Sequence, residues 1–238
     1  MKTNFSKILL SLLLTGGAHG AVVWTTTFTD SSAGANTGRN VVNTPASGFT
    51  DTLSSTYVLT RSEAATPTLL TGTNNSAANF NPRQNVDNAA GAFWQADFTF
   101  TGGTSTVDLS GVSFQIYRFN NTGNTQASDA TSRTVNFSAF YTTNGGTSWS
   151  PLGAVKNINT TTSNTGNILL NLDFALTNAA TVDLSENDFQ VRFRAENDGT
   201  NAGANIGINS FSVTAIPEPS ASLLLAAGTI LLITRRRA

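Results

Sequence analysis

The chain has 238 residues with 13 basic and 14 acidic side chains, a formal net charge of −1. It contains no cysteine, which excludes disulfide bonds, thiolate metal sites and cysteine nucleophiles. Residues 21–216 carry eight basic and 13 acidic side chains, a net charge of −5. A mildly acidic domain of this kind has no electrostatic basis for binding nucleic acid.

The first 20 residues have the pattern of a signal peptide. Lys2 and Lys7 give a positively charged start, and residues 8–14 form an apolar run too short to span a membrane. We expect cleavage after the small residue Gly20. Because His19 is the only histidine, the mature protein would contain neither histidine nor cysteine. This excludes Ser-His-Asp and Cys-His catalysis and ordinary zinc sites, and leaves carboxylate chemistry and oxygen-ligated calcium.

Residues 21–215 are predicted to form one all-β domain. Short segments rich in Val, Thr and aromatic residues alternate between apolar and polar positions, and polar loops separate them. In residues 92–100, for example, Trp94, Phe98 and Phe100 share one face. We expect nine to eleven strands, no soluble helix and an antiparallel β-sandwich of the jelly-roll type. The main predicted strands are 22–29, 57–61, 92–100, 112–119, 133–143, 149–155, 167–174, 188–195 and 206–214.

Two local features are predicted in more detail. The inward phase of the last strand shifts between Ile208 and Phe211, which indicates a β-bulge near Asn209-Ser210. Asn144-Gly145 predicts a type I′ hairpin, in which both central residues have positive φ. Residues 142–149 also resemble the Asp-box hairpin, with Asn144 in place of the aspartate. The resemblance implies a structural turn, and a single copy argues against a sialidase-like propeller.

One short sequence occurs twice. Thr-Val-Asp-Leu-Ser occupies residues 106–110 and again residues 181–185, and each copy is followed by a Phe-Gln pair at the same spacing. We interpret the two copies as similar entries from a turn into a strand. A duplicated half-domain is the alternative.

A possible calcium site lies in the second copy and just after it. Asp183, Glu186 and Asp188 are three carboxylates within six residues, and together with main-chain carbonyls they could hold the ion. Their spacing is not that of an EF-hand loop. A solvated turn is the alternative.

A possible glycan-binding face combines two strands. Gln115, Gln190, Arg192 and Arg194 fall on the polar side of their strands, and Tyr117 could stack on a sugar ring. If the two strands pair, their amide and guanidinium groups would meet on one face. An ordinary solvated sheet face is the alternative.

Catalysis is not expected. A glycosidase needs two carboxylates that face each other across a cleft. The candidates are Asp97, Asp108, Asp173 and Glu196, and no spacing selects a pair among them. We therefore predict a protein that is not an enzyme and has no cofactor, apart from the possible calcium ion.

The C-terminal segment, residues 216–238, has a pattern of its own. Two prolines keep the chain extended, residues 220–234 form a short apolar run, and three arginines follow, which stay charged and do not cross a bilayer. This combination resembles the PEP-CTERM sorting signal of Gram-negative bacteria, which a membrane protease-transpeptidase, an exosortase, is thought to process. The matching residues are Pro217, Glu218, Pro219, Arg235, Arg236 and Arg237.

The resemblance implies a transient anchor in the inner membrane and then display at the cell surface or in the extracellular matrix. We therefore expect an exported, non-catalytic protein associated with extracellular polysaccharide. Two alternatives stay open: a carbohydrate-binding module with a defined glycan site and structural calcium, and a carbohydrate-active enzyme.

Overall fold

The computed structural model describes residues 20–28, 41–62, 83–85, 91–119, 134–159, 169–198 and 205–216, with 83–85, 117–119, 159, 169 and 205 described by their backbone alone. Apart from Gly20 and Ile216, the predicted signal peptide and sorting tail lie outside the described residues. Within the described ranges, no helix is both long enough and apolar enough to span a membrane.

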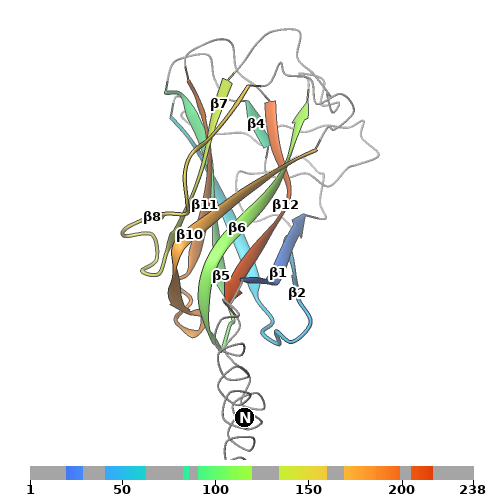
Figure 1. Ribbon diagram of the computed structural model, residues 1–238, viewed down its shortest axis with the longest axis vertical. Coiled ribbons are helices and arrows are strands. Elements are labelled where there is room, and N and C mark those ends of the chain that lie inside the picture. The colour runs from blue at the N-terminus through green and yellow to red at the C-terminus, as the bar shows by residue number, and fades with distance from the viewer. Residues whose placement is uncertain are drawn as a thin grey trace, which may run out of the picture.

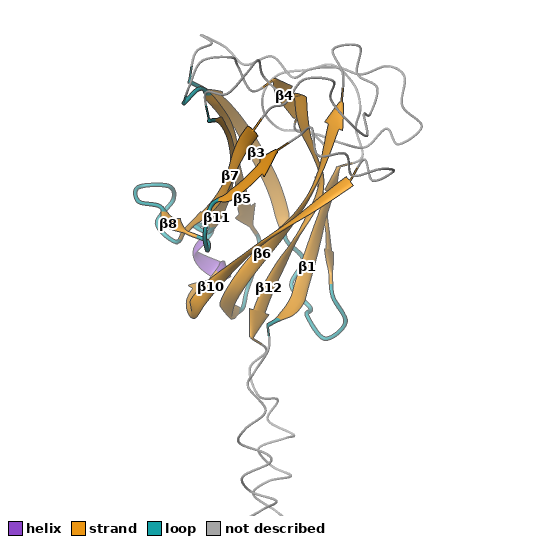
Figure 2. Ribbon diagram, turned by 45° about the horizontal axis from the view of Figure 1, so that its top comes forward, coloured by secondary structure: helices purple, strands orange, loops and turns teal. Residues whose placement is uncertain are grey.

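The described strands form two six-stranded antiparallel sheets (Figure 1). We call them the β6 sheet and the β11 sheet. The β6 sheet has the order β10 (Leu169–Asp183), β6 (Thr106–Phe119), β12 (Asn205–Ile216), β1 (Ala21–Phe28), β2 (Val41–Pro45), and β4 (Arg83–Asn85) also pairs with β12. The β11 sheet has the order β3 (Ser54–Arg61), β5 (Phe93–Thr101), β11 (Gln190–Asn197), β7 (Thr134–Thr142), β8 (Ser150–Pro151), and β9 (Lys156–Asn159) also pairs with β7. A one-turn 3₁₀ helix, η1 (Leu184–Glu186), leads from β10 toward β11 (Figure 2).

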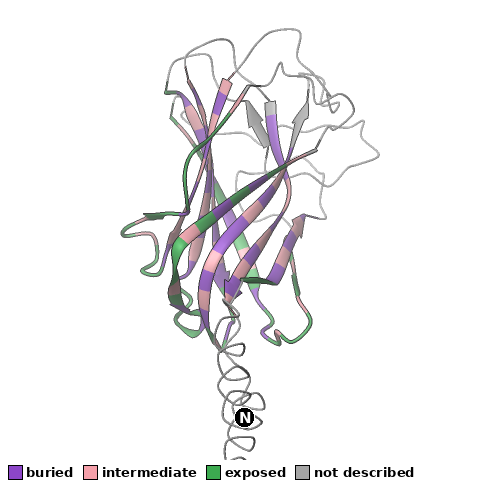
Figure 3. Cartoon of the chain, in the orientation of Figure 1, coloured by how far each residue is buried: buried purple, intermediate pink, exposed green. Residues whose placement is uncertain are grey.

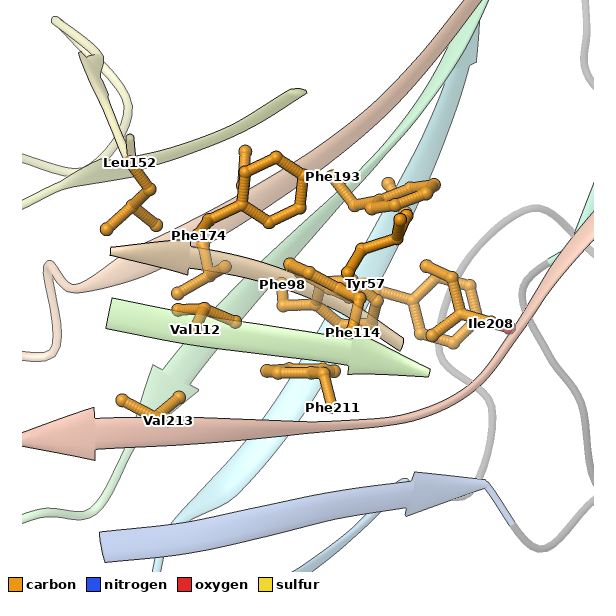
Figure 4. Close-up of a cluster of buried hydrophobic side chains, with 14 of the residues drawn as sticks. Tyr57, Phe98, Val112, Phe114, Leu152, Phe174, Phe193, Ile208, Phe211 and Val213 are labelled. Atoms are coloured by element: carbon orange, nitrogen blue, oxygen red, sulfur yellow. The ribbon is translucent and has the colours of Figure 1, made fainter. Parts of the chain in front are cut away.

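The core lies between the two sheets, and its largest fully buried side chains are aromatic (Figure 4). Phe98 of β5 meets Phe211 of β12 with ring centroids 4.7 Å apart. Phe114 of β6 meets Phe193 of β11 at 4.9 Å. Each such ring contributes about 2–3 kcal/mol by leaving water. The predicted antiparallel β-sandwich is therefore confirmed.

Burial alternates along the central strands as the sequence predicts (Figure 3). The predicted β-bulge is confirmed, because the pairing of β12 with β6 shifts register between Ile208 and Ser210. The predicted strand 149–155 is much shorter, since β8 has only two residues. Pro151 cannot donate a ladder hydrogen bond, and Gly153 turns the chain at a φ of 67°.

The two copies of Thr-Val-Asp-Leu-Ser lie side by side. Val107 pairs with Val182 in antiparallel register, and the threonine of each copy stands opposite the aspartate of the other. After this point the copies diverge. The first continues along β6 in its own sheet, whereas the second passes through η1 into β11 of the other sheet. Gln115 and Gln190, which follow the two copies at the same spacing, therefore lie in different sheets.

Asn43 joins the two sheets along one side of the sandwich. Its Oδ1 accepts a hydrogen bond from Thr26 Oγ1 of β1 at 2.7 Å. Its Nδ2 donates to the carbonyl of Leu53 and to Ser55 Oγ, both at 3.0 Å, at the start of β3. Thr26 is fully buried, so this hydrogen bond satisfies a hydroxyl that has no access to water.

Asp51 ties the loop before β3 to the turn between β5 and β6. Its carboxylate accepts hydrogen bonds from the main-chain N–H groups of Thr104 and Ser105, both at 2.9 Å, and from both hydroxyls. Burial raises the pKa of Asp51, but the hydrogen bonds from these two residues outweigh it and lower the pKa from 3.8 to about 2. The charged form is therefore the one that the fold stabilises.

We expect Asp51→Asn to lower the free energy of unfolding by about 2 kcal/mol at neutral pH, because a carboxylate whose pKa is depressed stabilises the fold only while it is ionised. The difference from wild type should be complete above about pH 5 and should shrink as the pH falls toward 2. Urea denaturation at a series of pH values measures it. Glu186→Gln, which removes an exposed carboxylate, is the control and should change stability little. A difference that stays constant down to pH 2 would refute this account of Asp51.

Candidate functional site

The outer face of the β11 sheet gathers charged, amide and aromatic side chains. The register of β11 with β5 sets Arg192 opposite Asp97, Arg194 opposite Gln95, and Glu196 opposite Phe93. Except for Gln95, which is itself buried, these positions are partly exposed and alternate with buried ones, so their side chains point away from the core. We call this surface the Arg192 face; it consists of Phe93, Gln95, Asp97, Trp149, Gln190, Arg192, Arg194 and Glu196.

Arg192 and Asp97 form a bidentate ion pair at the centre of this face. Arg192 Nε donates to Asp97 Oδ1 at 2.7 Å, and Arg192 Nη2 donates to Asp97 Oδ2 at 2.8 Å. Both side chains are about one-fifth exposed. Two parallel hydrogen bonds hold the guanidinium plane in one orientation, and its Nη1 stays outside this pair.

Trp149 covers one side of the Arg192 guanidinium. The Cζ of Arg192 lies 3.8 Å from the centroid of the indole ring, the geometry of a cation–π interaction. The partners of Arg192 therefore come from a neighbouring strand, β5, and from the turn that follows β7.

The turn that places Trp149 is closed by side chains. Asn144 Oδ1 accepts hydrogen bonds from Ser148 N at 3.0 Å and from Thr142 Oγ1 at 2.7 Å, and Asn144 Nδ2 donates to Ser148 Oγ at 2.8 Å. The positive φ values lie at Gly145 (64°) and Gly146 (88°) and not at Asn144. The type I′ prediction was therefore wrong, because the Asn144 side chain organises the turn and leaves its own backbone at negative φ.

Arg194 forms the second ion pair of the face. Its Nη2 lies 2.8 Å from Glu196 Oε2, and these side chains are 29% and 35% exposed. The Cζ of Arg194 also lies 3.7 Å from the ring centroid of Phe93. Its Nε is buried without a hydrogen-bond partner, so packing on the ring and the Glu196 pair hold this side chain.

The two strands that were combined in the predicted glycan-binding face lie in different sheets. Gln190, Arg192 and Arg194 share the Arg192 face, but Gln115 and Tyr117 belong to β6, which does not pair with β11. Gln115 points out of the β6 sheet, where its Oε1 accepts from Asn209 Nδ2 at 2.6 Å. The side chain of Tyr117 lies outside the described residues. The assumed pairing of the two strands was therefore wrong, and the five residues do not share one face.

The predicted calcium ligands are not brought together. Among the described residues, no three His, Cys, Asp or Glu side chains are grouped so that they could hold a metal ion. Asp183 instead caps η1, where its Oδ1 accepts from the amide and the hydroxyl of Ser185, and these hydrogen bonds lower its pKa. Glu186 lies within η1, and the main-chain carbonyl of Asp188 accepts from Gly145 N.

The four carboxylates considered for glycosidase chemistry divide between the two outer faces. Asp97 and Glu196 belong to the β11 sheet, and each forms an ion pair there. Asp108 and Asp173 belong to strands of the β6 sheet. Carboxylates from different sheets point away from each other, so they do not form a pair across a cleft.

Sequence reasoning missed the two contacts that organise the site. Asp97 was considered only as a catalytic candidate, and Trp149 only as part of a turn. A weak signal exists for Asp97, because it occupies a polar position in an alternating strand. Its pairing with Arg192 depends on two strands 95 residues apart in the chain.

A separate cleft of about 370 Å³ opens beside the start of β1 and the end of β12. It is lined mainly by residues 21–23, 47–50, 105–107 and 215–216. None of the predicted site residues is among them, so the cleft is distinct from the Arg192 face.

No protein-family model matches the chain, and no curated protein matches it. Among solved structures, it is similar to a family 28 carbohydrate-binding module specific for non-crystalline cellulose (14% identity, TM-score 0.41, covering 67% of this chain and 80% of the module). It is also similar to a family 11 carbohydrate-binding module from Clostridium thermocellum in complex with a β-1,3-1,4-mixed-linked tetrasaccharide (12% identity, TM-score 0.36, covering 83% of this chain and 100% of the module). A third similarity is to an arabinose-bound GH51 α-L-arabinofuranosidase (15%, TM-score 0.38, 82% of this chain and 27% of that one). At such low identities and TM-scores, these likenesses establish neither a function nor a ligand for this chain.

We expect the two ion pairs to differ in strength. A double-mutant cycle with Asp97→Ala and Arg192→Ala should give a coupling free energy of about 1–3 kcal/mol, because the pair is bidentate and mostly buried. The same cycle with Arg194→Ala and Glu196→Ala should give less than about 1 kcal/mol, because that pair is more exposed. Urea denaturation of the single and double variants measures both. Equal couplings, or the reverse order, would contradict this ranking.

Proposed function

We propose that this chain is an exported, non-catalytic β-sandwich of the jelly-roll type that binds extracellular polysaccharide through the Arg192 face. In this proposal, the signal peptide directs export. The PEP-CTERM-like tail holds the domain at the inner membrane until an exosortase-type protease processes it. The mature domain then works at the cell surface or in the surrounding matrix.

The observation that carries the proposal is the mixture of groups fixed on one face. A sugar ring offers hydroxyls that both donate and accept hydrogen bonds, and its C–H faces pack on aromatic rings. The Arg192 face supplies guanidinium and amide donors, amide and carboxylate acceptors, and the rings of Phe93 and Trp149. A plain solvated sheet face would not require this combination.

The side chains of this face are also held in place before any ligand arrives. Asp97 fixes Arg192 from one side and Trp149 covers it from another. Glu196 and Phe93 hold Arg194 in the same way. Binding therefore costs little additional side-chain entropy, which is about 0.5–1.5 kcal/mol for each long side chain that must be immobilised. This favours a defined binding face over a passive matrix protein.

The position of the chain ends suits display from a membrane. Ala21 at the start of β1 pairs with Ala215 near the end of β12. The expected signal cleavage after Gly20 and the sorting motif from Pro217 would therefore lie at the same end of the sandwich. An anchor at that end would leave the Arg192 face, which lies along the side of the domain, open to polysaccharide.

We expect the full-length chain, purified in mild detergent, to bind one class of polysaccharide saturably, as measured by affinity electrophoresis or calorimetry. Trp149→Ala and Arg194→Ala should each weaken this binding at least about tenfold, since central aromatic and arginine residues dominate binding energies.

Gln115→Ala is the matched control, because Gln115 points out of the opposite sheet. It should bind as the wild type does. Saturable binding that only Gln115→Ala weakens would place the site on the β6 sheet instead. No binding by the wild type would leave a passive matrix protein, and hydrolysis of the polysaccharide would indicate an enzyme.

A further inference from the structure

The Arg192 face has an internal charge balance. We propose that its ligand is an uncharged polysaccharide, and that Asp97 and Glu196 set this preference by neutralising the two arginines. This inference rests on the proposed function, because it names the ligand class of the same face.

The charges on this face cancel in pairs. Along the outward positions of β3, β5, β11 and β7, the charged residues are Asp97, Arg192, Arg194 and Glu196. Each cation lies 2.7–2.8 Å from a carboxylate oxygen. The other outward side chains of these strands are hydroxyl, amide or apolar. Among the described outward side chains of these four strands, an acidic polysaccharide would therefore meet no uncompensated positive charge.

The geometry of Arg192 also disfavours binding of an acidic group. Arginine binds an anion best through two parallel N–H groups on one edge of the guanidinium. Asp97 already occupies the edge formed by Nε and Nη2. A uronate or sulfate group could reach only the remaining N–H groups. It would also lie near the Asp97 carboxylate, and like charges placed close together at an interface disfavour binding.

An uncharged sugar hydroxyl is not repelled by the Asp97 carboxylate. It needs a single donor or acceptor and carries no charge, so the remaining N–H groups of Arg192 and the partly exposed amide of Gln190 can serve it. The ion pairs then position the donors without attracting anions. In this arrangement Asp97 and Glu196 act on specificity through the arginines.

The opposite outer face offers no alternative site for acidic ligands among its described side chains. Asp108 accepts a hydrogen bond from Thr181 Oγ1 at 2.8 Å, and Asp173 accepts one from Ser113 Oγ at 2.5 Å. Both partners are neutral hydroxyls, which add no positive charge beside the carboxylates, so this face would not attract an anionic chain.

The test compares uncharged glucans, xylan and galactomannan with polygalacturonate and alginate, using the full-length chain at about 0.05 and 0.5 M salt. We expect the wild type to bind an uncharged polysaccharide with an affinity that salt barely changes, and to bind the acidic ones at least about tenfold more weakly. Asp97→Asn and Glu196→Gln should each gain at least about tenfold in affinity for polygalacturonate at low salt, and the gain should vanish at high salt.

Asp173→Asn is the matched control, because it adds the same change in net charge on the opposite face. It should gain no affinity for polygalacturonate. An equal gain in this variant would show that total charge, and not the Arg192 face, sets the preference. Glu196→Gln keeps the test valid if Asp97→Asn does not fold, which thermal unfolding would show.

The two proposals fail in different ways. Tight, salt-sensitive binding of the wild type to polygalacturonate or alginate through Trp149 would overturn the inference and leave polysaccharide binding intact. Absence of binding to every polysaccharide, by the wild type and by all variants, would overturn the proposed function and this inference with it.

Discussion

The packing of aromatic rings between the two sheets is the constraint on which the rest of the structure depends. With no cysteine in the chain, no disulfide can support the fold, and the contacts of Phe98 with Phe211 and of Phe114 with Phe193 join the sheets. Because side chains alternate along a strand, every strand that commits one face to this core must send its other face to water. The charged and amide side chains of the Arg192 face stand where they do because Phe193 and its buried neighbours in β11 point the other way.

The centre of the β11 sheet is also where a preorganised polar surface is easiest to build. β11 has a neighbour on each side, β5 and β7, so Arg192 is flanked by side chains from both directions. Asp97 comes from β5, and Trp149 from the turn beyond β7. An edge strand would provide such partners on one side only. The same arrangement explains why both arginines are only partly exposed although they face away from the core.

Local patterns predicted much of the fold, and non-local pairing accounts for most of what they missed. Alternation over a few residues correctly placed Trp94 and Phe98 inside, and the phase shift after Ile208 correctly predicted the bulge. Predicting the candidate site required knowing which strands are neighbours, and no local sequence pattern indicates this. Gln115 and Gln190 follow identical five-residue segments, yet the chain after one segment stays in the β6 sheet and the chain after the other crosses to the β11 sheet. The type I′ prediction at Asn144 was wrong for a different reason. The hydrogen bonds that the Asn144 side chain makes with Thr142 and Ser148 overrode the backbone preference of Asn-Gly.

The place of β12 within its sheet has a mechanical consequence. β12 runs between β6 and β1 and pairs with both along much of its length, and it ends at Ile216, directly before the tail. Tension transmitted from a membrane anchor would pull β12 along its own axis. Interstrand hydrogen bonds run perpendicular to that axis, so the bonds on both sides of β12 would carry the load together in shear, whereas an edge strand peeled from one side would lose them one at a time. If the domain is tethered and binds polysaccharide as proposed, the central place of β12 would help it to stay folded under such tension.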